Sequence, residues 1–474
     1  MSKRPNIIWF CTDQQRFDTI GALGNPHVST PTIDGLVRGG TAFTHTYCQS
    51  PICTPSRASF MSGMYPAKVR NTRNGNATFP EDVPVISQLI ADAGYDCAQI
   101  GKFHLSSSGK RTEPRLPQGD GFRVWNFSHA PRDNWPEGEH DYADWVREKG
   151  GDLNAMRETP ERVPAEFHQT TWAVDRSIQF IADAEKVRDD DQPWMVNVNI
   201  YDPHPPFIPP KEYADQFDAE SMPGPSFVES DLETQAGLDG ADFQTKSQSP
   251  DQIEAKDAQA KYYAMIKLID DQLARLLDFL KESGQAEDTV IIFTSDHGET
   301  LGDHGLLYKG CRFYEGLVRV PLIFHWPGHF KENVQSPALV ELLDMSASLL
   351  EIAGVKIPEH HQGKSLLPIL LGEIEPDHHR DFVRCEYFDA LAPFFLEGAT
   401  GTFATMHRTP THKLVMYHSL GKGELYDLEK DLWEHDNLWD DPNSAPIKTE
   451  LMEASFNAHV NFTTDVGSKR IAPM

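Results

Sequence analysis

The sequence predicts an α/β fold in which a doubly wound, mostly parallel central sheet is flanked by helices. Short continuous apolar runs alternate with helical segments through the first 375 residues, which is typical of strands buried on both faces of a parallel sheet. After about residue 375, strand-like runs follow one another without a long helix between them, which predicts a small antiparallel sheet. We therefore expect an α/β domain over residues 1–375 and a small C-terminal α+β subdomain over residues 376–474.

The individual elements follow from local patterns of apolar residues. In the α/β domain we expect strands at 6–12, 95–100, 194–200, 289–294 and 320–325. We expect helices at 32–38, 84–93, 166–184, 254–282 and 337–353. The pattern is clearest at 254–282, where apolar residues recur at steps of three and four. In the subdomain we expect strands at 381–387, 401–406 and 412–417, followed by a terminal helix.

Two long segments of the α/β domain lack a clear period. Residues 105–164 are rich in Pro, Gly, Trp and charged residues, so we expect an irregular insertion that forms one wall of a pocket. Residues 208–250 are polar, and we expect a loop there.

The composition excludes several classes of partner. Hydrophobic residues make up 39% of the chain and charged residues 24%, which is typical of globular proteins. A net charge of −28 argues against nucleic acid and anionic membranes as partners, because both require basic surfaces. No stretch approaches the roughly 20 apolar residues of a membrane span, and the run 6–11 is too short for a signal sequence. The six scattered cysteines lack a C-x-x-C pair, so we expect reduced thiols and a cytoplasmic protein.

The string C-T-P-S-R at Cys53 to Arg57 is unusual for a loop. We expect a helix over 56–62, with Ser56 capping its start and Gly63 following its end. The start of such a helix would direct backbone N–H groups toward Cys53 and any anion beside it. Cys53 could be a buried structural thiol or a thiolate nucleophile. The phosphatase loop, in which Cys and Arg are six positions apart, is absent because Arg57 follows Cys53 by only four positions.

Polar clusters directly follow four of the predicted strands. Ligands of doubly wound sheets bind beyond the carboxyl ends of the strands. Unrelated surface residues would not fall so regularly at strand ends, so we expect one edge of the sheet to carry a site. The clusters are Asp13-Gln14, Lys102 with His104, His204, and Asp296-His297.

Two of these clusters contain residues suited to binding a metal ion. Asp13 and Asp296 would repel each other at one edge of the sheet unless a cation lay between them. Gln14 offers a carbonyl oxygen and His297 an imidazole nitrogen. Oxygen ligands favour Ca²⁺ or Mg²⁺, whereas the imidazole favours Mn²⁺. Taken singly, each Asp could also be a turn or helix-cap residue.

A second set of residues is cationic and suits an anionic substrate. Arg57, Lys102 and Lys309 could hold a tetrahedral oxyanion, although a lone lysine is usually a solvated surface group. His104 follows Lys102 in G-K-F-H. His204 lies in the rigid string D-P-H-P-P, which suits proton transfer to a leaving oxygen, and it could otherwise be a capped loop histidine.

The sequence resembles type I sulfatases of the alkaline phosphatase superfamily along most of its length. The resemblance rests on P-N-I-I-W-F-C-T-D-Q, C-T-P-S-R with A-S-x-x-S-G, G-K-F-H, D-P-H-P-P-F and S-D-H-G-E-T-L-G-D-H-G. The late string E-L-Y-D-L-E-K-D is similar to the C-terminal subdomain of these sulfatases. The resemblance implies an alkaline-phosphatase-like catalytic domain over 1–375 and the activity of a sulfuric ester hydrolase.

The resemblance also implies a role for each candidate residue. A formylglycine-generating maturation enzyme would oxidise Cys53 to formylglycine, whose hydrate would be the nucleophile. One divalent ion, for which we expect Ca²⁺ ahead of Mn²⁺ or Mg²⁺, would be bound by Asp13, Gln14, Cys53, Asp296 and His297. Arg57 would stabilise the nucleophile, Lys102 and Lys309 would hold sulfate oxygens, and His104 and His204 would transfer protons. The substrate would be a small anionic sulfate ester, and the resemblance allows a homo-oligomer.

Two positions depart from the pattern of many sulfatases. Gln14 stands where many have a second Asp, and His297 stands where many have Asn. This pair resembles phosphonate monoester hydrolases and choline-sulfatase-like members of the group, whereas Lys102 and His104 keep the sulfatase pattern. The first hypothesis is hydrolysis of a sulfate monoester with an aryl, choline or sugar leaving group. The alternatives are a phosphonate monoester or phosphodiester hydrolase and a non-catalytic metal-binding relative.

Overall fold

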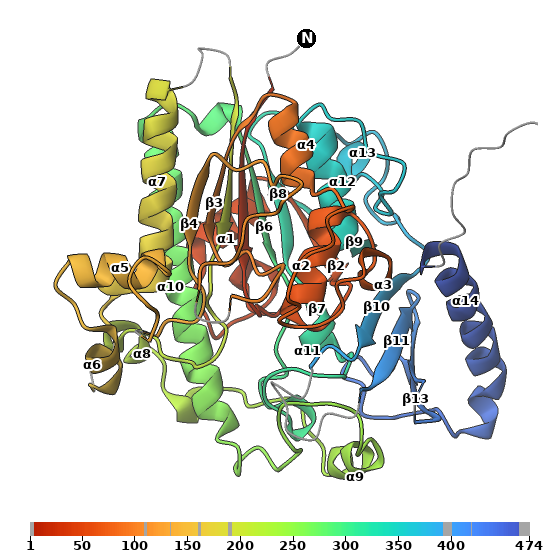
Figure 1. Ribbon diagram of the computed structural model, residues 1–474. Coiled ribbons are helices and arrows are strands. Elements are labelled where there is room, and N and C mark those ends of the chain that lie inside the picture. The colour runs from red at the N-terminus through yellow and green to blue at the C-terminus, as the bar shows by residue number, and fades with distance from the viewer. Residues whose placement is uncertain are drawn as a thin grey trace, which may run out of the picture.

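The central sheet lies between two layers of helices, and a smaller sheet lies beside it near the C-terminus (Figure 1). The structure is a computed structural model that describes residues 4–108, 111–132, 134–159, 163–187, 192–391, 401–418 and 420–463. It confirms the predicted α/β class with a mostly parallel central sheet and a small antiparallel sheet. A domain boundary near residue 375 stays a prediction.

Nine strands form the central sheet. They are β1 (Asn6–Thr12), β2 (Thr41–Tyr47), β3 (Asp96–Gly101), β4 (Val124–Phe127), β5 (Trp194–Asn199), β6 (Thr289–Ser295), β7 (Arg319–Val320), β8 (Leu322–His325) and β9 (Val334–Glu341). Their order is β4-β3-β5-β1-β6-β8-β2-β7, and β9 also pairs with β2. Strand β1 pairs in parallel with both β5 and β6, and all seven of its residues are buried. This central position explains its continuous apolar sequence.

Helices cover both faces of the central sheet. Those up to the middle of the chain are α1 (Pro31–Arg38), α2 (Cys53–Ser62), α3 (Pro66–Val69), α4 (Ile86–Asp92), α5 (Asp141–Glu148), α6 (Leu153–Glu158), α7 (Gln169–Val187), α8 (Lys211–Ala214) and α9 (Ser230–Gly237). Those that follow are α10 (Ala255–Glu282), α11 (Glu315–Val318), α12 (Leu342–Ile352), α13 (Leu367–Leu370) and α14 (Ala445–Thr463). Short 3-10 turns are η1 (Gly21–Leu23), η2 (Ala165–Phe167), η3 (Ala219–Ser221), η4 (Ala286–Asp288), η5 (Asp303–Gly305) and η6 (Pro442–Ser444).

The alternating side chains of β1 divide the core into two halves. Ile7 and Trp9 belong to the apolar cluster that contains residues of α2, α4 and α12. Ile8 and Phe10 belong to the cluster that contains residues of α1, α7 and α10. Since successive side chains of a strand point to opposite faces, each helical layer packs on its own face of the sheet.

The smaller sheet is antiparallel and has the order β10-β11-β12-β13. Its strands are β10 (Val383–Phe388), β11 (Phe403–Arg408), β12 (His412–Tyr417) and β13 (Lys422–Asp427). Helix α14 contacts β11 and β12, which agrees with its place beside the sheet in Figure 1. The buried Lys413 of β12 forms ion pairs with Glu315 of α11 (2.8 Å) and with Glu434 (2.6 Å). These ion pairs connect the smaller sheet to the segment that leads into β7.

Three local expectations were wrong or incomplete. The segment expected as a helix over 337–353 begins as strand β9 and becomes helical only in α12. Among the named strands, β9 pairs with β2, and its Leu339 forms one isolated bridge with Arg380. It tolerates Pro337 because a missing N–H costs little at an edge of the sheet. Within 105–164, expected to be irregular, the structure forms β4, α5 and α6. Likewise, the expected loop over 208–250 contains α8, η3 and α9.

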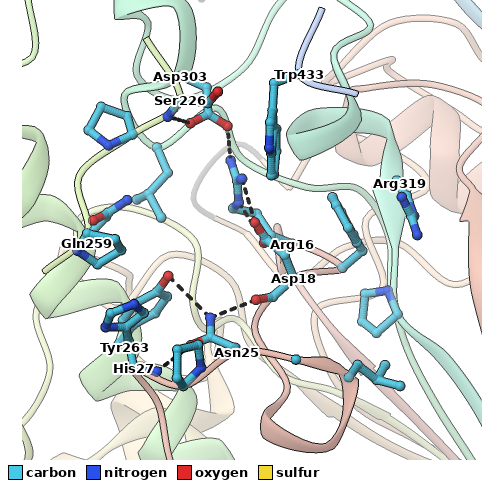
Figure 2. A pocket seen from close by; sticks show the side chains of 18 of the residues that line it. Arg16, Asp18, Asn25, His27, Ser226, Gln259, Tyr263, Asp303, Arg319 and Trp433 are labelled. Carbon is cyan, nitrogen blue, oxygen red and sulfur yellow. Dashed lines mark hydrogen bonds and ion pairs between the residues drawn. The ribbon is translucent and has the colours of Figure 1, made fainter. Parts of the chain in front are cut away.

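A cavity of about 440 Å³ lies at the start of the loop that follows β1 (Figure 2). Its polar wall includes Arg16, which forms ion pairs with Asp18 and Asp303, and Trp433 closes another side.

Within the part of the chain that the structure describes, no helix combines the length and apolar character needed to cross a membrane. All six cysteines are free thiols, as expected.

Candidate active site

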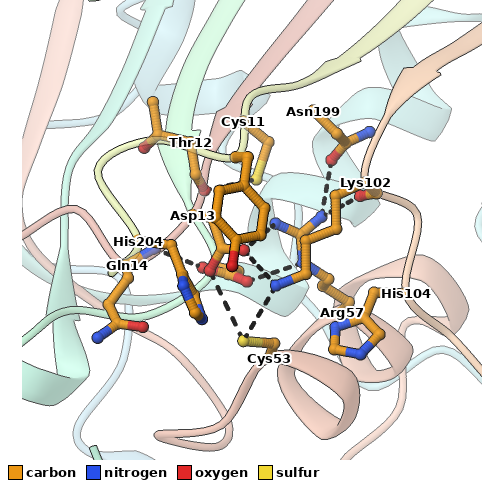
Figure 3. Close-up of polar contacts among 12 residues, drawn as sticks. Cys11, Thr12, Asp13, Gln14, Cys53, Arg57, Lys102, His104, Asn199 and His204 are labelled. Carbon is orange, nitrogen blue, oxygen red and sulfur yellow. Dashed lines mark hydrogen bonds and ion pairs between the residues drawn. The ribbon is translucent and has the colours of Figure 1, made fainter. Parts of the chain in front are cut away.

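Residues from six segments of the chain converge at the carboxyl ends of β1, β3, β5 and β6. Figure 3 shows those from the ends of β1, β3 and β5 and from α2. Strands β1, β3 and β6 end directly before a predicted polar cluster, and His204 lies in the loop that follows β5. The structure brings the four clusters together. The loop after η5 adds Lys309, and the first turns of α2 add Cys53 and Arg57. The converging residues are Asp13, Gln14, Cys53, Arg57, Lys102, His204, Asp296, His297 and Lys309.

The thiol of Cys53 lies at the centre of this cluster. Its Sγ is 2.8 Å from Nζ of Lys309, 3.1 Å from Nε2 of His297 and 3.5 Å from Nζ of Lys102. Burial and the Asp13 carboxylate raise the pKa of the thiol, but the two lysines and His297 outweigh them, so the net shift is downward. The structure therefore surrounds the side chain at position 53 with positive charge.

Helix α2 places Cys53 and Arg57, and its start differs from the expectation. The helix begins at Cys53 with Ile52 as the N-cap residue, so Ser56 does not cap it. Instead, the Ser56 hydroxyl donates to the main-chain oxygen of Asp296 (2.6 Å) and joins the helix to the end of β6. Gly63 ends the helix as predicted, at φ 73°, a left-handed conformation that favours glycine.

The guanidinium of Arg57 connects three strand ends. Its Nε donates to Oδ2 of Asp296 (2.7 Å), and its Nη1 donates to the main-chain oxygen of Lys102 (2.6 Å) and to Oδ1 of Asn199 (2.9 Å). Its Nη2 is buried and has no hydrogen-bond partner among the described residues. A buried donor without a partner is costly, so Nη2 is available to an anion in the site.

The donor set of a metal ion is present in the same place. Ligand atoms of Asp13, Cys53, Asp296 and His297 all lie within 4.8 Å of one another. Nδ1 of His297 lies 2.8 Å from the main-chain oxygen of Gly298, an arrangement that leaves Nε2 facing the two carboxylates. Gln14 donates its amide to Glu299, so its Oε1 faces the cluster. Oriented oxygen and imidazole donors of this kind fit a divalent cation.

Opposite charges within the cluster shift the pKa values of their neighbours. Burial alone would raise the pKa of Asp13, but Lys102 and the other neighbouring cations hold it well below its ordinary value. Burial would lower the pKa of His297, as would Lys309, but Asp296 and Cys53 together outweigh them and the net shift is upward. Lys102 contacts both Asp13, a candidate metal ligand, and Cys53, the candidate nucleophile.

Both histidines expected to transfer protons are buried or half-buried beside lysines. Burial and Lys309 lower the pKa of His204 well below its ordinary value, and burial and Lys102 do the same for His104. Nε2 of His204 lies 3.1 Å from Nζ of Lys309, and its Nδ1 lies 2.6 Å from the main-chain oxygen of Pro205. In this geometry, Nε2 of a neutral His204 imidazole accepts a hydrogen bond from the Lys309 ammonium group. An anionic substrate beside it would raise its pKa.

His104 occupies the margin of the cluster. Its ring packs edge-on against His129, with centroids 4.7 Å apart, and its backbone has φ 60°. The buried carboxylate of Glu113 accepts hydrogen bonds from the backbone N–H groups of His104 (2.6 Å), Leu105 (2.6 Å) and Ser106 (2.8 Å). Glu113 therefore holds the turn that carries His104.

The sequence patterns did not reveal the groups that support the cluster. Glu113 lies in the segment 105–164, which has no helical or strand periodicity. Glu299 belongs to the string S-D-H-G-E, but its type and spacing predict no role. Asn199 could have been found from the sequence, because two asparagines alternate with apolar residues at the end of W-M-V-N-V-N. Buried polar residues on one face of a central strand indicate hydrogen-bonded partners near the strand end.

Family comparison assigns the chain to a known class. The Sulfatase family model matches residues 5–355, and a model described as N-sulphoglucosamine sulphohydrolase, C-terminal, matches residues 302–460. The first match alone covers more than half of the chain, including the whole cluster around Cys53. The protein therefore belongs to the sulfatase family, within the alkaline phosphatase superfamily, and is a hydrolase of sulfate esters.

Individual relatives agree with this assignment. The chain is 29% identical to an arylsulfatase of Clostridium perfringens, over 92% of this chain and 90% of the relative. It is 28% identical to the multifunctional alkaline phosphatase superfamily protein PehA of Trinickia caryophylli, over 96% and 95% of the two chains. Among solved structures, the phosphonate monoester hydrolase of Agrobacterium radiobacter superimposes with a TM-score of 0.80 at 25% identity, covering 97% of this chain and 96% of that one.

Proposed function

We propose that the protein hydrolyses a sulfate monoester at the cluster around Cys53. The observation that supports this most directly is the placement of two ammonium groups within 3.5 Å of Sγ, beside a donor set that fits a divalent ion. A sulfate monoester carries three non-bridging oxygens, and Lys102, Lys309 and Nη2 of Arg57 are donors for them. This Nη2 lies 4.0 Å from Oδ2 of Asp13 and makes no hydrogen bond among the described residues.

Two groups that the family implies fit the residues present. Asp13, Gln14, Asp296 and His297 would hold a divalent ion, for which we expect Ca²⁺, and the ion would supply Lewis acidity and positive charge. Formylglycine, made from Cys53 by a maturation enzyme, would as its hydrate supply one hydroxyl for attack and a second for release of sulfate. The Sγ atom of the structure stands where these oxygens would lie.

The chain's own residues would bind the substrate and move its protons. Lys102 and Lys309, both buried, would orient the sulfate group and offset its charge. His204 and Lys309 face each other across 3.1 Å, so they can deliver a proton to the leaving oxygen. His104, held by the turn that Glu113 anchors, is placed to accept a proton when sulfate is released.

The second candidate is hydrolysis of a phosphonate monoester or phosphodiester at the same site. The pair Gln14 and His297 favours it, and the fold likeness to a phosphonate monoester hydrolase is compatible with it. Such substrates leave two non-bridging oxygens, one fewer than a sulfate monoester.

Steady-state rates on matched substrates test the proposal. We expect kcat/KM for an aryl sulfate, choline sulfate or a sugar sulfate to exceed that for aryl phosphonates and phosphodiesters. The Cys53→Ser variant should fold and lose turnover on all of them. A wild-type enzyme faster on diesters than on every sulfate ester would favour the second candidate.

The chemical state of residue 53 is tested separately. Mass spectrometry of the tryptic peptide 39–57 from active enzyme should show an aldehyde in place of the Cys53 thiol. Active enzyme in which this residue is entirely an alkylatable thiol would contradict the formylglycine mechanism.

A further inference from the structure

A second cluster of ligand-type side chains lies outside the catalytic site. Asp231 of α9, His304 of η5 and His435, which follows β13, offer ligand atoms that all lie within 4.8 Å of one another. Asp231 and His304 are buried, and the side chain of His435 is 20% exposed. The three residues are 73 or more positions apart in sequence, so the fold alone assembles them.

The distances within the cluster fit a tetrahedral transition-metal site. Oδ1 of Asp231 lies 3.2 Å from Nδ1 of His304 and 3.1 Å from Nδ1 of His435. In a tetrahedral zinc site with bonds of about 2.0–2.1 Å, neighbouring ligand atoms are about 3.3 Å apart. The two distances from Oδ1 to the imidazoles therefore already match the spacing of a coordination shell, and the two Nδ1 atoms lie within 4.8 Å of each other.

The surroundings hold the ligands in orientations suited to a metal. The second oxygen of Asp231 accepts a hydrogen bond from the backbone N–H of Val228 (2.9 Å). Nε2 of His435 lies 2.9 Å from the Ser226 hydroxyl, so it can carry the ring proton while Nδ1 keeps its lone pair for a metal. The ring of His304 stacks on Tyr314, with centroids 3.7 Å apart. These contacts fix all three ligands before any ion binds.

We propose that Asp231, His304 and His435 form a second metal site, selective for Zn²⁺ or a similar transition ion, with an exchangeable fourth ligand. Imidazole nitrogens with one carboxylate favour such ions over Ca²⁺, in contrast to the oxygen-rich catalytic cluster. Ser226, the hydrogen-bond partner of His435, lines the cavity of Figure 2, which gives an ion a route to the site.

The bound ion would join three parts of the fold. It would connect α9 and the segment after β13 to the turn at η5, where His304 has φ 53° and a left-handed backbone. Lys309 of the catalytic cluster lies five residues beyond His304. The ion would therefore stabilise the loop that delivers Lys309, and its role would be structural rather than catalytic.

Zinc titration of the full-length protein, first dialysed against a chelator, tests the proposal. We expect wild-type protein to bind one more equivalent of Zn²⁺ than the His435→Gln variant, by elemental analysis after gel filtration. At a hundredfold excess over Kd, Zn²⁺ should raise the Tm of wild type by roughly 3 °C and that of the variant by much less. His459→Gln, a change at a partly buried histidine of α14, is the matched control and should bind Zn²⁺ as wild type does.

Two further measurements separate this site from the catalytic one. The Asp296→Asn variant, changed in the catalytic cluster, should still bind the equivalent of Zn²⁺ that the His435→Gln variant no longer binds. Anomalous diffraction at the zinc edge should show a peak between Oδ1 of Asp231 and the two Nδ1 atoms. Equal zinc content in wild type and His435→Gln, or zinc-soaked crystals without this peak, would overturn the proposal. Neither result depends on which ester the enzyme hydrolyses.

Discussion

Lys102 is the residue at which the two candidate activities separate. Its ammonium group contacts Asp13 and lies 3.5 Å from Sγ of Cys53, so it can reach both the nucleophile and a substrate oxygen. A group that binds the third oxygen of a sulfate monoester has less to bind in a diester, where an ester group occupies that place.

Replacing this side chain should therefore affect the substrates unequally. We expect Lys102→Ala to lower kcat/KM for sulfate esters by roughly 10²–10³, the usual cost of one oxyanion donor, and for phosphodiesters by much less. Lys256→Ala, at an exposed lysine of α10, is the control and should change neither. Equal losses on both substrates would mean that Lys102 acts through Asp13 or the nucleophile instead.

Glu113 provides a pH-dependent test of how the turn at His104 is held. Burial raises its pKa from 4.5 to about 7, although three backbone N–H groups partly oppose the shift. Between these pH values the folded protein binds more protons than the unfolded chain, so the free energy of unfolding falls as pH rises. The slope contributed by this residue is at most about 1.4 kcal/mol per pH unit.

The variant Glu113→Gln removes this titration. Urea unfolding at pH 5 and pH 7.5 should show that the stability advantage of wild type over the variant shrinks with rising pH. The variant also loses one acceptor oxygen, but that loss is the same at both pH values. Parallel pH profiles for the two proteins would show that Glu113 does not titrate in this range.

The primary residues of the site could be predicted from the sequence because they follow strand ends. Asp13, Lys102, His204 and Asp296 each come soon after an apolar run, and parallel strands bring such positions to one edge. Glu113 and Glu299 could not be predicted, because their partners are backbone or amide groups that leave no spacing in the sequence. Their roles depend on loop conformation, which is set by the assembled fold.

At the scale of elements, α2 is the helix on which the site depends. All ten of its residues are buried, and it ends at Gly63. A Cβ atom at Gly63 would lie 2.0 Å from the ring of His361, in addition to the strain of its positive φ. The end of the helix is therefore fixed both by backbone conformation and by the neighbouring loop.

The variant Gly63→Ala should lower the free energy of unfolding by more than backbone strain at positive φ alone would, because the new Cβ atom also clashes with His361. Gly24→Ala is the matched control, because Gly24 also has a positive φ but a Cβ atom added there would have no neighbour within 4 Å. We expect the control to cost about 1 kcal/mol and Gly63→Ala to cost at least about 2 kcal/mol more, measured by urea unfolding. Similar losses for the two variants would show that His361 moves aside freely.

Elements that are long or form an unbroken apolar run could be predicted, whereas strands whose sequences contain polar residues or proline could not. Helix α10 and strands β1 and β6 fall within a residue or two of their expected bounds. The sequence does not predict strands β2 and β9, because β2 contains several polar residues and β9 contains Pro337. Strand β2 pairs with β7, β8 and β9 inside the sheet, so its polar side chains alone account for the difference. Strand β9 has fewer strand partners, and the sequences of edge strands are less restricted.

At the scale of the whole molecule, buried ion pairs connect the smaller sheet to the catalytic half. Lys413 pairs with Glu315 and Glu434, and its ammonium also donates to the main-chain oxygen of Phe313 (2.9 Å). Lys413→Met would leave the buried Glu434 without its cation and Glu315 with Arg319 (3.2 Å) alone, which should cost about 3–5 kcal/mol of unfolding free energy. Lys422→Met, at an exposed lysine of β13, should change stability by less than about 0.5 kcal/mol.

The two Lys variants are compared by denaturant unfolding, with Tm as a second readout. A small loss for Lys413→Met would mean that Glu315 and Glu434 share a proton once the lysine is gone, and that the pairs contribute little. Burial raises the pKa of Glu434 to about 7, so such proton uptake would grow as pH falls through 7.

The burial of Cys53 sets an order of events during biosynthesis. Its side chain is 1% exposed and lies on a helix with no exposed residue, so a second enzyme cannot enclose the thiol once α2 has docked. Under the proposed mechanism, Cys53 therefore has to be oxidised to formylglycine before α2 docks, on the ribosome or soon after release. Rapid overproduction should then yield well-folded but inactive molecules. A peptide spanning residues 47–63 should be converted by the maturation enzyme in vitro, while folded thiol protein in the same tube keeps its Cys53, as mass spectrometry of both would show.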